Sequence, residues 1–350
     1  MRAGTFLRFF SIYFIVVAII FYNENDAFSF NFILNEKNDK TPVFLRLDNG
    51  VLEEEKPTEI PKNEEKETVS NLQSTEQKSE QVSAEAVKGK IESRYISPYT
   101  VSTHYDKIYL KNSTDLKLDI KALFESKLGF KIQKSDEPQV LIMHTHTTES
   151  YVLEDKGYYT EEYTSRNTDN NKNMAALGKI VTDILNAEGI KTLHDVTQHD
   201  YPKYSGSYTR AAKTVNAYLK KYPSIKIVLD IHRDAISAGG NDKVKLVTEI
   251  DGKKAAQVML VMGSNSSSTD NHPKWQENLK LALKLQQTIE NDYPTLARPL
   301  SLMPKNYNQS LTTGSLLLEI GTDANTLDEA KYSASLVGKS LAHIIRKQIS

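Results

Sequence analysis

The chain contains no cysteine. It therefore forms no disulfide, offers no thiol nucleophile and holds no metal through sulfur. Any metal ion must be held by histidine, aspartate or glutamate side chains. The chain also lacks an excess of charge of either sign, because 44 basic residues face 45 acidic ones and the formal net charge is -1. This balance argues against a nucleic-acid partner recruited by bulk positive charge. A length of 350 residues allows one large domain or two ordinary ones.

A long apolar run is present at the amino terminus, where residues 9–22 are uncharged and follow Arg2 and Arg8. A basic flank before an apolar core is typical of a signal peptide or a signal anchor. No small-x-small cleavage pattern follows, so we expect a retained transmembrane helix over residues 1–25 rather than a cleaved leader. The basic flank predicts a single-pass protein of the cell membrane, with everything after residue 25 outside the cytoplasm.

Aromatic residues are absent from residues 51–90, which carry ten Glu and six Lys. Such a segment buries too little apolar surface to offset the entropy of the chain, and it stays solvated from about Leu52 to Ser93. We therefore predict a disordered extracytoplasmic tether over residues 26–94. Such a flexible linker would let the folded domain reach substrate at a distance from its membrane.

Residues 95–350 regain aromatic and apolar residues, and predicted strands and helices alternate along them. This order predicts an α/β domain with a mostly parallel central sheet and flanking helices. A short strand and helix at residues 116–124 are expected at its edge. The predicted strands are 140–143, 190–193, 225–231, 244–250, 256–262 and 315–320, and the predicted helices are 173–188, 208–221, 275–289 and 326–345.

Three of the predicted strands end in ionisable side chains. A single histidine at a strand end is usually a satisfied core residue, but the carboxyl ends of parallel strands meet at one edge of a sheet. Two histidines and one carboxylate with an open position form a common catalytic zinc site. A further glutamate beside such a site can take a proton from the water. The residues concerned are His144, His146 and Glu149 after the first strand, Asp230, His232 and Arg233 at the second, and Glu319 in the last.

Glu319 stands out because its neighbours, Leu316 to Leu318 and Ile320, are expected to be buried. A buried carboxylate is costly unless it has a charged or hydrogen-bonding partner or is protonated. One alternative is a salt bridge, for instance with Arg233. The other is a raised pKa, which suits a general base.

Three blocks of this sequence read HTHTTESY at 144–151, VLDIHRDA at 228–235 and LLLEIGTDANTLDEA at 316–330. They resemble the signature blocks of the stage II sporulation protein P family. Short blocks at 194–195 and 307–309 are also similar, and the resemblance covers roughly residues 100–350. It implies a fold similar to the zinc N-acetylmuramoyl-L-alanine amidases and a zinc-dependent amidase of peptidoglycan that also cuts peptide cross-links.

The resemblance further implies a place of action and partners. The family acts in forespore engulfment during sporulation, so the catalytic domain is expected on the mother cell side of the septum. Expected partners are the peptidoglycan itself and stage II sporulation proteins D and M.

By position, the resemblance makes His232 a zinc ligand and Glu319 the catalytic base. Arg233 is expected to polarise the scissile carbonyl or to hold Glu319. Three further residues are expected behind the ligands or facing the substrate, and these are His194, Asp230 and Asn308.

The first block leaves two ligand choices open. The alignment places His146 at the ligand position, with His144 as the alternative. The family's usual glutamate ligand at the start of the next helix is replaced here by polar residues at 171–173. Glu149 is the expected replacement, and Asp169 is the alternative.

Two other function classes remain open from the sequence. The protein would be a membrane-tethered module that binds or assembles cell wall with a vestigial site, or a metal carboxypeptidase or endopeptidase that acts only on stem peptides. Zinc content tests the first alternative, and analysis of digested muropeptides tests the second.

Overall fold

The computed structural model describes residues 30–34, 43–48, 51–55, 87–266 and 271–348. The chain divides into two units, Met1–Ser79 and Glu80–Ser350. The predicted transmembrane segment at 1–25 lies outside the described residues. Among the residues that the structure does describe, no helix is both long and apolar enough to cross a membrane.

The first unit contains an antiparallel sheet of three strands, β1 (Phe30–Leu34), β2 (Val43–Asp48) and β3 (Val51–Glu55). The prediction of a disordered tether over residues 26–94 is wrong for these three strands. Asn49 and Gly50, between β2 and β3 in the sequence, are the pair that two-residue hairpins favour. This local turn signal outweighs the acidic composition of β3.

The second unit is built on a sheet of eight strands in the order β5-β6-β15-β14-β16-β10-β7-β9. Five of the seven neighbouring pairs are parallel, and only β5/β6 and β14/β16 are antiparallel. The prediction of a mostly parallel central sheet is confirmed. The strands are β5 (Thr103–Tyr105), β6 (Ile108–Asn112), β7 (Val140–Met143), β9 (Thr192–His194), β10 (Ile227–Asp234), β14 (Val258–Gly263), β15 (Leu300–Met303) and β16 (Gly314–Thr322).

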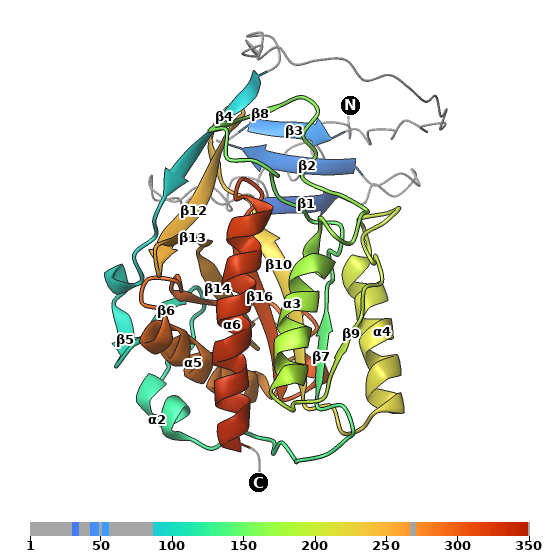
Figure 1. Cartoon of the computed structure of the whole chain (residues 1–350), viewed down its shortest axis with the longest axis vertical. Coiled ribbons are helices and arrows are strands. Elements are labelled where there is room, and N and C mark those ends of the chain that lie inside the picture. The colour runs from blue at the N-terminus through green and yellow to red at the C-terminus, as the bar shows by residue number, and fades with distance from the viewer. Residues whose placement is uncertain (1–29, 35–42, 49–50, 56–86, 267–270, 349–350) are drawn as a thin grey trace, which may run out of the picture. The chain divides into compact units, whose positions relative to one another are not determined.

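Helices cover both faces of this sheet. Figure 1 shows α3 and α6 side by side across one face. On the other face α4 packs through Ala211 and Val215 on Leu141, Met143 and Val228. The α-helices are α2 (Ile120–Glu125), α3 (Met174–Ala187), α4 (Ser207–Lys221), α5 (Trp275–Asp292) and α6 (Leu327–Gln348), and the 3₁₀ turns are η2 (Pro98–Thr100) and η3 (Gln309–Leu311).

A second sheet has the order β11-β12-β4-β8, with β13 paired to β12. Its strands are β4 (Val87–Arg94), β8 (Tyr158–Thr160), β11 (Ser237–Gly239), β12 (Asp242–Ile250) and β13 (Lys253–Ala256). The prediction of a solvated tether is therefore also wrong for Val87–Ser93. Strand β4 pairs with β12, about 150 residues later in the chain, and such a distant partner leaves no trace in local composition.

Candidate functional site

Side chains of β7, β10 and β16 alternate between the two faces of the main sheet, as those of any strand do. Val140, Ile142 and Leu229 belong to the core under α3 and α6. His232 lies on the opposite face, because it is an even number of residues from Val228, which packs against α4. His232 and Glu319 are direct partners in the parallel register of β10 and β16, so their side chains share this face.

His144 follows the face of Ile142 and turns toward α3. Its Nδ1 lies 3.1 Å from the Ile231 carbonyl oxygen, and its Nε2 lies 2.9 Å from Nε2 of His194. Burial lowers the pKa of His144 to about 3 and that of His194 to about 4, so both rings are neutral. Both rings lie against Gly178 of α3, where a Cβ would overlap them. The structure thus pairs His144 with His194 and brings neither to His232.

His146, Glu149 and His232 meet on the α4 side. The ring centroids of His146 and His232 are 5.3 Å apart and nearly perpendicular. Glu149 Oε2 lies 3.6 Å from His232 Nδ1 and accepts a hydrogen bond from the backbone N–H of Arg233 at 3.3 Å. Although burial opposes ionisation, the charges of Arg233 and His232 hold the pKa of Glu149 well below its usual range. The cluster therefore contains a firmly ionised carboxylate.

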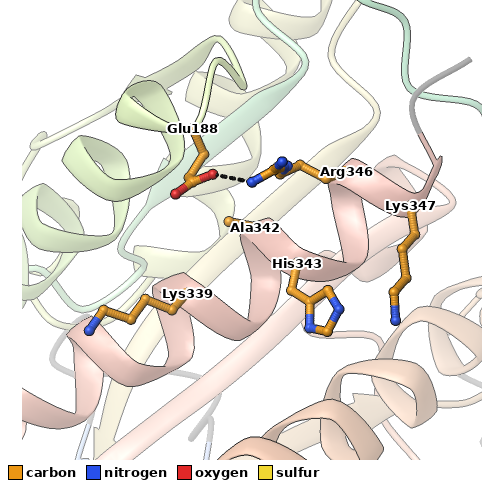
Figure 2. A pocket seen from close by; sticks show the side chains of 6 residues that line it. All are labelled: Glu188, Lys339, Ala342, His343, Arg346 and Lys347. Carbon is orange, nitrogen blue, oxygen red and sulfur yellow. Dashed lines mark hydrogen bonds and ion pairs between the residues drawn. The ribbon is translucent and has the colours of Figure 1, made fainter.

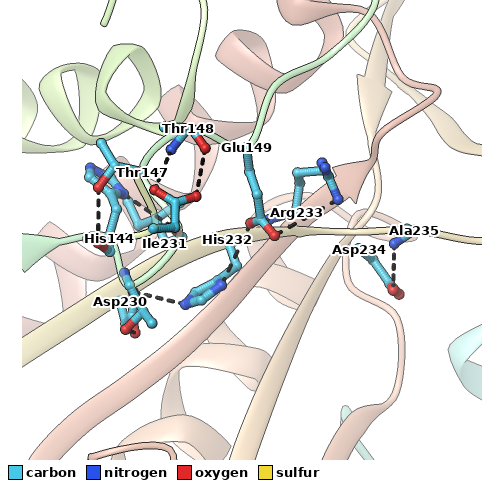
Figure 3. A network of polar contacts seen from close by, with 12 residues as sticks. His144, Thr147, Thr148, Glu149, Asp230, Ile231, His232, Arg233, Asp234 and Ala235 are labelled. Carbon is cyan, nitrogen blue, oxygen red and sulfur yellow. Dashed lines mark hydrogen bonds and ion pairs between the residues drawn. The ribbon is translucent and has the colours of Figure 1, made fainter. Parts of the chain in front are cut away.

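His232 lies between two carboxylates, as Figure 3 shows. Its Nε2 is 2.9 Å from Asp230 Oδ1, while its Nδ1 faces Glu149. Asp230 is itself held by Thr145, whose N–H and hydroxyl donate to its two oxygens at 2.8 and 2.6 Å. Burial alone would lower the pKa of His232, but Asp230 and Glu149 raise it well above the usual value. Positive charge is therefore strongly stabilised between these two carboxylates.

His146 has a buried Nδ1 without a hydrogen-bond partner. Burial lowers its pKa to about 4, so at neutral pH the ring is uncharged. Tyr204 stacks on the ring at 4.6 Å, and Tyr208 meets it edge-on at 5.6 Å. Asn308, predicted near the site, donates from Nδ2 to the Tyr208 carbonyl at 2.8 Å and so holds the start of α4.

The two tyrosines were not singled out by the sequence reasoning. Their signal is a polar segment, YPKYSGSY at 201–208, that places three aromatic rings just before and at the start of a helix. Only the fold brings this segment onto the ring of His146.

Arg233 is buried and its guanidinium is engaged with the protein. Its Nε donates to the Ser150 carbonyl at 3.2 Å, its Nη2 donates to the Ser165 carbonyl at 2.8 Å, and its Nη1 lies 3.9 Å from Glu149 Oε1. These contacts fasten the segment after β7 to β10. None of them is to Glu319, so the salt bridge suggested for that pair is not formed.

Glu319 has a buried Oε2 without a hydrogen-bond partner. Burial raises the pKa of Glu319 to about 8, and the negative charges of Asp234 and Glu149 add to this effect. The charges of His232 and Arg298 act in the opposite direction. Near neutral pH this carboxyl therefore exchanges a proton readily, as a general base and acid must.

Asp169, the alternative ligand, lies at the surface. Its carboxylate accepts hydrogen bonds from Asn171 at 2.9 and 3.0 Å and lies 3.8 Å from Lys172 Nζ. Asn173, at the start of α3, uses its side chain to accept the Ala175 N–H at 2.9 Å. The position where the family's glutamate is expected thus caps a helix here, and Asp169 is bonded to its own turn.

Within the described ranges, no three His, Asp or Glu side chains stand ready as a set of metal ligands. The donor types at His146, Glu149 and His232 nevertheless fit zinc, which takes imidazole nitrogen and carboxylate oxygen. The unpartnered Nδ1 of neutral His146 is available to a metal, since ligands must be deprotonated. Asp230 and Glu149, which stabilise a proton on His232, would equally stabilise a metal ion bound to its deprotonated ring.

A pocket with a cavity volume of about 490 Å³ lies elsewhere, along α6 (Figure 2). None of the predicted site residues lines it. Arg346 is 2.7 Å from Glu188 across one side of it. Its lining residues are Glu188, Lys339, Ala342, His343, Arg346 and Lys347.

Comparison with solved structures finds N-acetylmuramoyl-L-alanine amidases. AmiC2 of Nostoc punctiforme is 16% identical with a TM-score of 0.35, and the match covers 61% of this chain and 97% of that one. The CwlD amidase from Clostridioides difficile, solved with the GerS lipoprotein, is 10% identical with a TM-score of 0.36, covering 60% and 98%. Likenesses this weak carry no argument about the function of this chain.

Sequence comparison is more specific. Stage II sporulation protein P of Bacillus subtilis (strain 168) is 30% identical over 213 residues, which cover 57% of this chain and 49% of the relative. The chain thus spans about half the length of this curated relative. The family model of Stage II sporulation protein P matches residues 22–345. Since that match extends over nearly the whole sequence and includes the three signature blocks, the chain belongs to the stage II sporulation protein P family.

Proposed function

We propose that this protein is a zinc-dependent peptidoglycan hydrolase that cleaves the amide between N-acetylmuramic acid and L-alanine. The observation that carries the proposal is the meeting of neutral His146, ionised Glu149 and His232 beside Glu319, whose pKa is near 8. Membership of the family supports the substrate class.

The zinc ion would be held by His146, Glu149 and His232. Of the two histidines open from the sequence, His146 is preferred, because His144 lies on the other face of the sheet beside His194. His232 lies between Asp230, 2.9 Å from its Nε2, and Glu149, which faces its Nδ1, and Nε2 has no hydrogen-bond partner and stays available to a metal. Such carboxylate partners orient metal-binding histidines. When bound, zinc supplies an acidified water and polarises the scissile carbonyl.

Glu319 acts as the general base and then as the acid. It takes a proton from the attacking water while the oxygen of that water forms a bond to the lactyl carbonyl carbon. The C–N bond then breaks, and Glu319 returns the proton to the leaving amine of L-alanine. A carboxyl with a pKa near 8 is suited to both transfers, because its two protonation states are close in energy at working pH.

In this mechanism Arg233 positions Glu149 and does not contact the substrate. Its backbone and guanidinium hold Glu149 and the carbonyl oxygens of Ser150 and Ser165. We therefore assign it the task of fixing Glu149 rather than that of binding the scissile carbonyl.

We also infer that the protein works outside the cytoplasm, anchored by residues 1–25, on the mother cell side of the septum. The apolar run behind Arg2 and Arg8 and the family membership support this place of action. Stage II sporulation proteins D and M are the proposed partners. Cross-link endopeptidase activity is a second proposed activity of the same site. Loss of the carboxyl-terminal domain to external protease in intact protoplasts tests the orientation.

The function is tested by digestion of purified peptidoglycan with the full-length protein in detergent, followed by mass spectrometry of the products. An amidase frees intact stem peptides from glycan, whereas an enzyme of stem peptides alone leaves every lactyl amide intact. His232→Ala is expected to lose both bound zinc and activity. The matched control is His343→Ala, at a half-exposed position on α6. Wild-type protein without zinc or turnover would instead identify a wall-binding module.

A further inference from the structure

Arg298 lies at the same edge of the sheet as the candidate site, although no sequence motif around it indicates a function. It lies two residues before the start of β15, and its backbone N–H donates to the Val258 carbonyl at the start of β14 at 2.7 Å. Because β14 runs antiparallel to β16, this start lies beside Ile320, the residue after Glu319. The Arg298 side chain reaches β10, where its Nη1 is 2.9 Å from Asp234 Oδ2. Asp234 is two residues beyond His232.

The guanidinium of Arg298 has donors that no protein atom accepts. The residue is only 4% exposed, and its buried Nε and Nη2 have no hydrogen-bond partner. Buried N–H groups of a charged side chain are costly when they are left unpaired, so such groups are nearly always satisfied. These two donors are therefore available to an acceptor from outside the chain.

The unpaired atoms define the shape of that acceptor. Nε and Nη2 form one edge of the planar guanidinium, and two parallel hydrogen bonds from such an edge suit a carboxylate. Asp234 occupies Nη1 on the other side and holds the fork in place. Asp234 is held in turn by the Ala235 N–H at 2.8 Å.

Glu319 is near enough for the charge of Arg298 to lower its pKa, yet no ion pair joins the two in the part of the chain that the structure describes. Glu319 Oε2 and the free edge of Arg298 are thus both buried and both without a partner. A ligand that places a carboxylate on Arg298 would lie at the same edge of the sheet as the proposed base.

We propose that Arg298, held by Asp234, binds a carboxylate of the stem peptide next to the scissile amide. This rests on the proposed function, in which the muramic lactyl carboxyl is tied up in the amide. The carboxylates left to the substrate then belong to its peptide, and the nearest is the α-carboxylate of the second residue when that residue is D-glutamate. Arg298 thus selects for the leaving peptide and rejects its amidated form.

The test compares two soluble muropeptides that differ only in whether this carboxylate is free or amidated. Full-length wild-type protein is expected to prefer the free acid by roughly tenfold or more in kcat/KM, since a site built to pair a buried group rejects an analogue that leaves it unpaired. Arg298→Gln is expected to lose the preference, so that kcat/KM becomes the same for the acid and the amide. Arg298→Lys keeps the charge without the fork and is expected to retain part of the preference. Arg346→Gln, an exposed arginine on α6, is the control and keeps the wild-type preference.

Calorimetry with the free L-alanyl-D-glutamate peptide and its amide separates this proposal from the amidase assignment. Wild-type binding of the acid alone, lost in Arg298→Gln and weakened in Arg298→Lys, supports the carboxylate site even if neither muropeptide is cleaved. Cleavage of both muropeptides without preference for the acid would refute the carboxylate site but not the amidase assignment. An equal loss of activity on both muropeptides in the folded variants also overturns it, because Arg298 would then act only on Glu319.

Discussion

Replacement of Glu319 by glutamine is expected to stabilise the metal-free protein while it abolishes turnover. The folded pKa of Glu319 is about 8 against an ordinary value of 4.5, because burial disfavours the ionised form. The folded chain therefore binds this proton more tightly than the unfolded chain does. The contribution of this carboxyl to stability is complete below pH 4.5 and is lost as the pH rises through 8.

The size of the effect follows from the pKa difference. At about 1.36 kcal/mol for each pKa unit, the ionised carboxylate costs the fold at most about 5 kcal/mol above pH 8. Glutamine has the same shape and no charge to bury, so Glu319→Gln is expected to match the wild type near pH 4.5 and to exceed its free energy of unfolding at pH 8.5.

Urea unfolding followed by circular dichroism, with chelator present, measures this difference at the two pH values. Glu161→Gln is the matched control, because it removes the same charge from a carboxylate that is 69% exposed. Turnover of peptidoglycan is expected to fall by about 10² to 10⁴ in Glu319→Gln with zinc content unchanged. A variant no more stable than the wild type at pH 8.5 would refute the buried, high-pKa carboxyl, and full turnover would refute its role as the base.

Three other predictions concern the surroundings of the site and the fold. Gly178→Ala is expected to lower the free energy of unfolding by about 1 to 3 kcal/mol, because its Cβ would overlap the rings of His144 and His194, and urea unfolding measures this. Lys245→Ala is expected to cost about 3 to 5 kcal/mol, because buried Glu329 loses the cation that balances its charge. Lys254→Ala, in an exposed pair, is expected to cost about 0 to 1 kcal/mol, and equal losses in the two variants would contradict the burial of the first pair. Zinc at 100 times its dissociation constant is expected to stabilise the wild type by about 2.7 kcal/mol, seen as a higher melting temperature that chelator reverses, and no shift would count against a metal site.

Much of the α/β layout follows from local patterns. The run Val140–Met143, the alternation of strands with helices and the apolar spacing of α3 and α6 are all properties of short windows. The polar residues that follow or interrupt these apolar strands could likewise be found without a structure. Strand β4 could not, because its partner β12 lies far along the chain and its own composition is that of a solvated segment.

The placement of the two histidines of the first block needed the tertiary structure. His144 continues the alternation of β7 and turns under α3, but β7 ends at Met143, so the pattern of the strand says nothing reliable about His146. The position of His146 depends on Tyr204 and Tyr208, which α4 and the segment before it bring from 60 residues away. Asp169 is a plausible ligand by residue type alone, yet its hydrogen bonds to Asn171 hold it in its own turn at the surface.

The sequence by itself determined the family, the α/β class and the residues that carry the proposed chemistry, because these depend on residue types and local spacing. Only the tertiary structure decided which of those side chains meet. It joined His146 to Glu149 and His232, sent His144 to His194, turned Arg233 toward Glu149 and placed the unpaired edge of Arg298 beside the strand of Glu319. The physical reason is that a shared site depends on the face and register of strands far apart in the chain, and packing of the whole domain sets both.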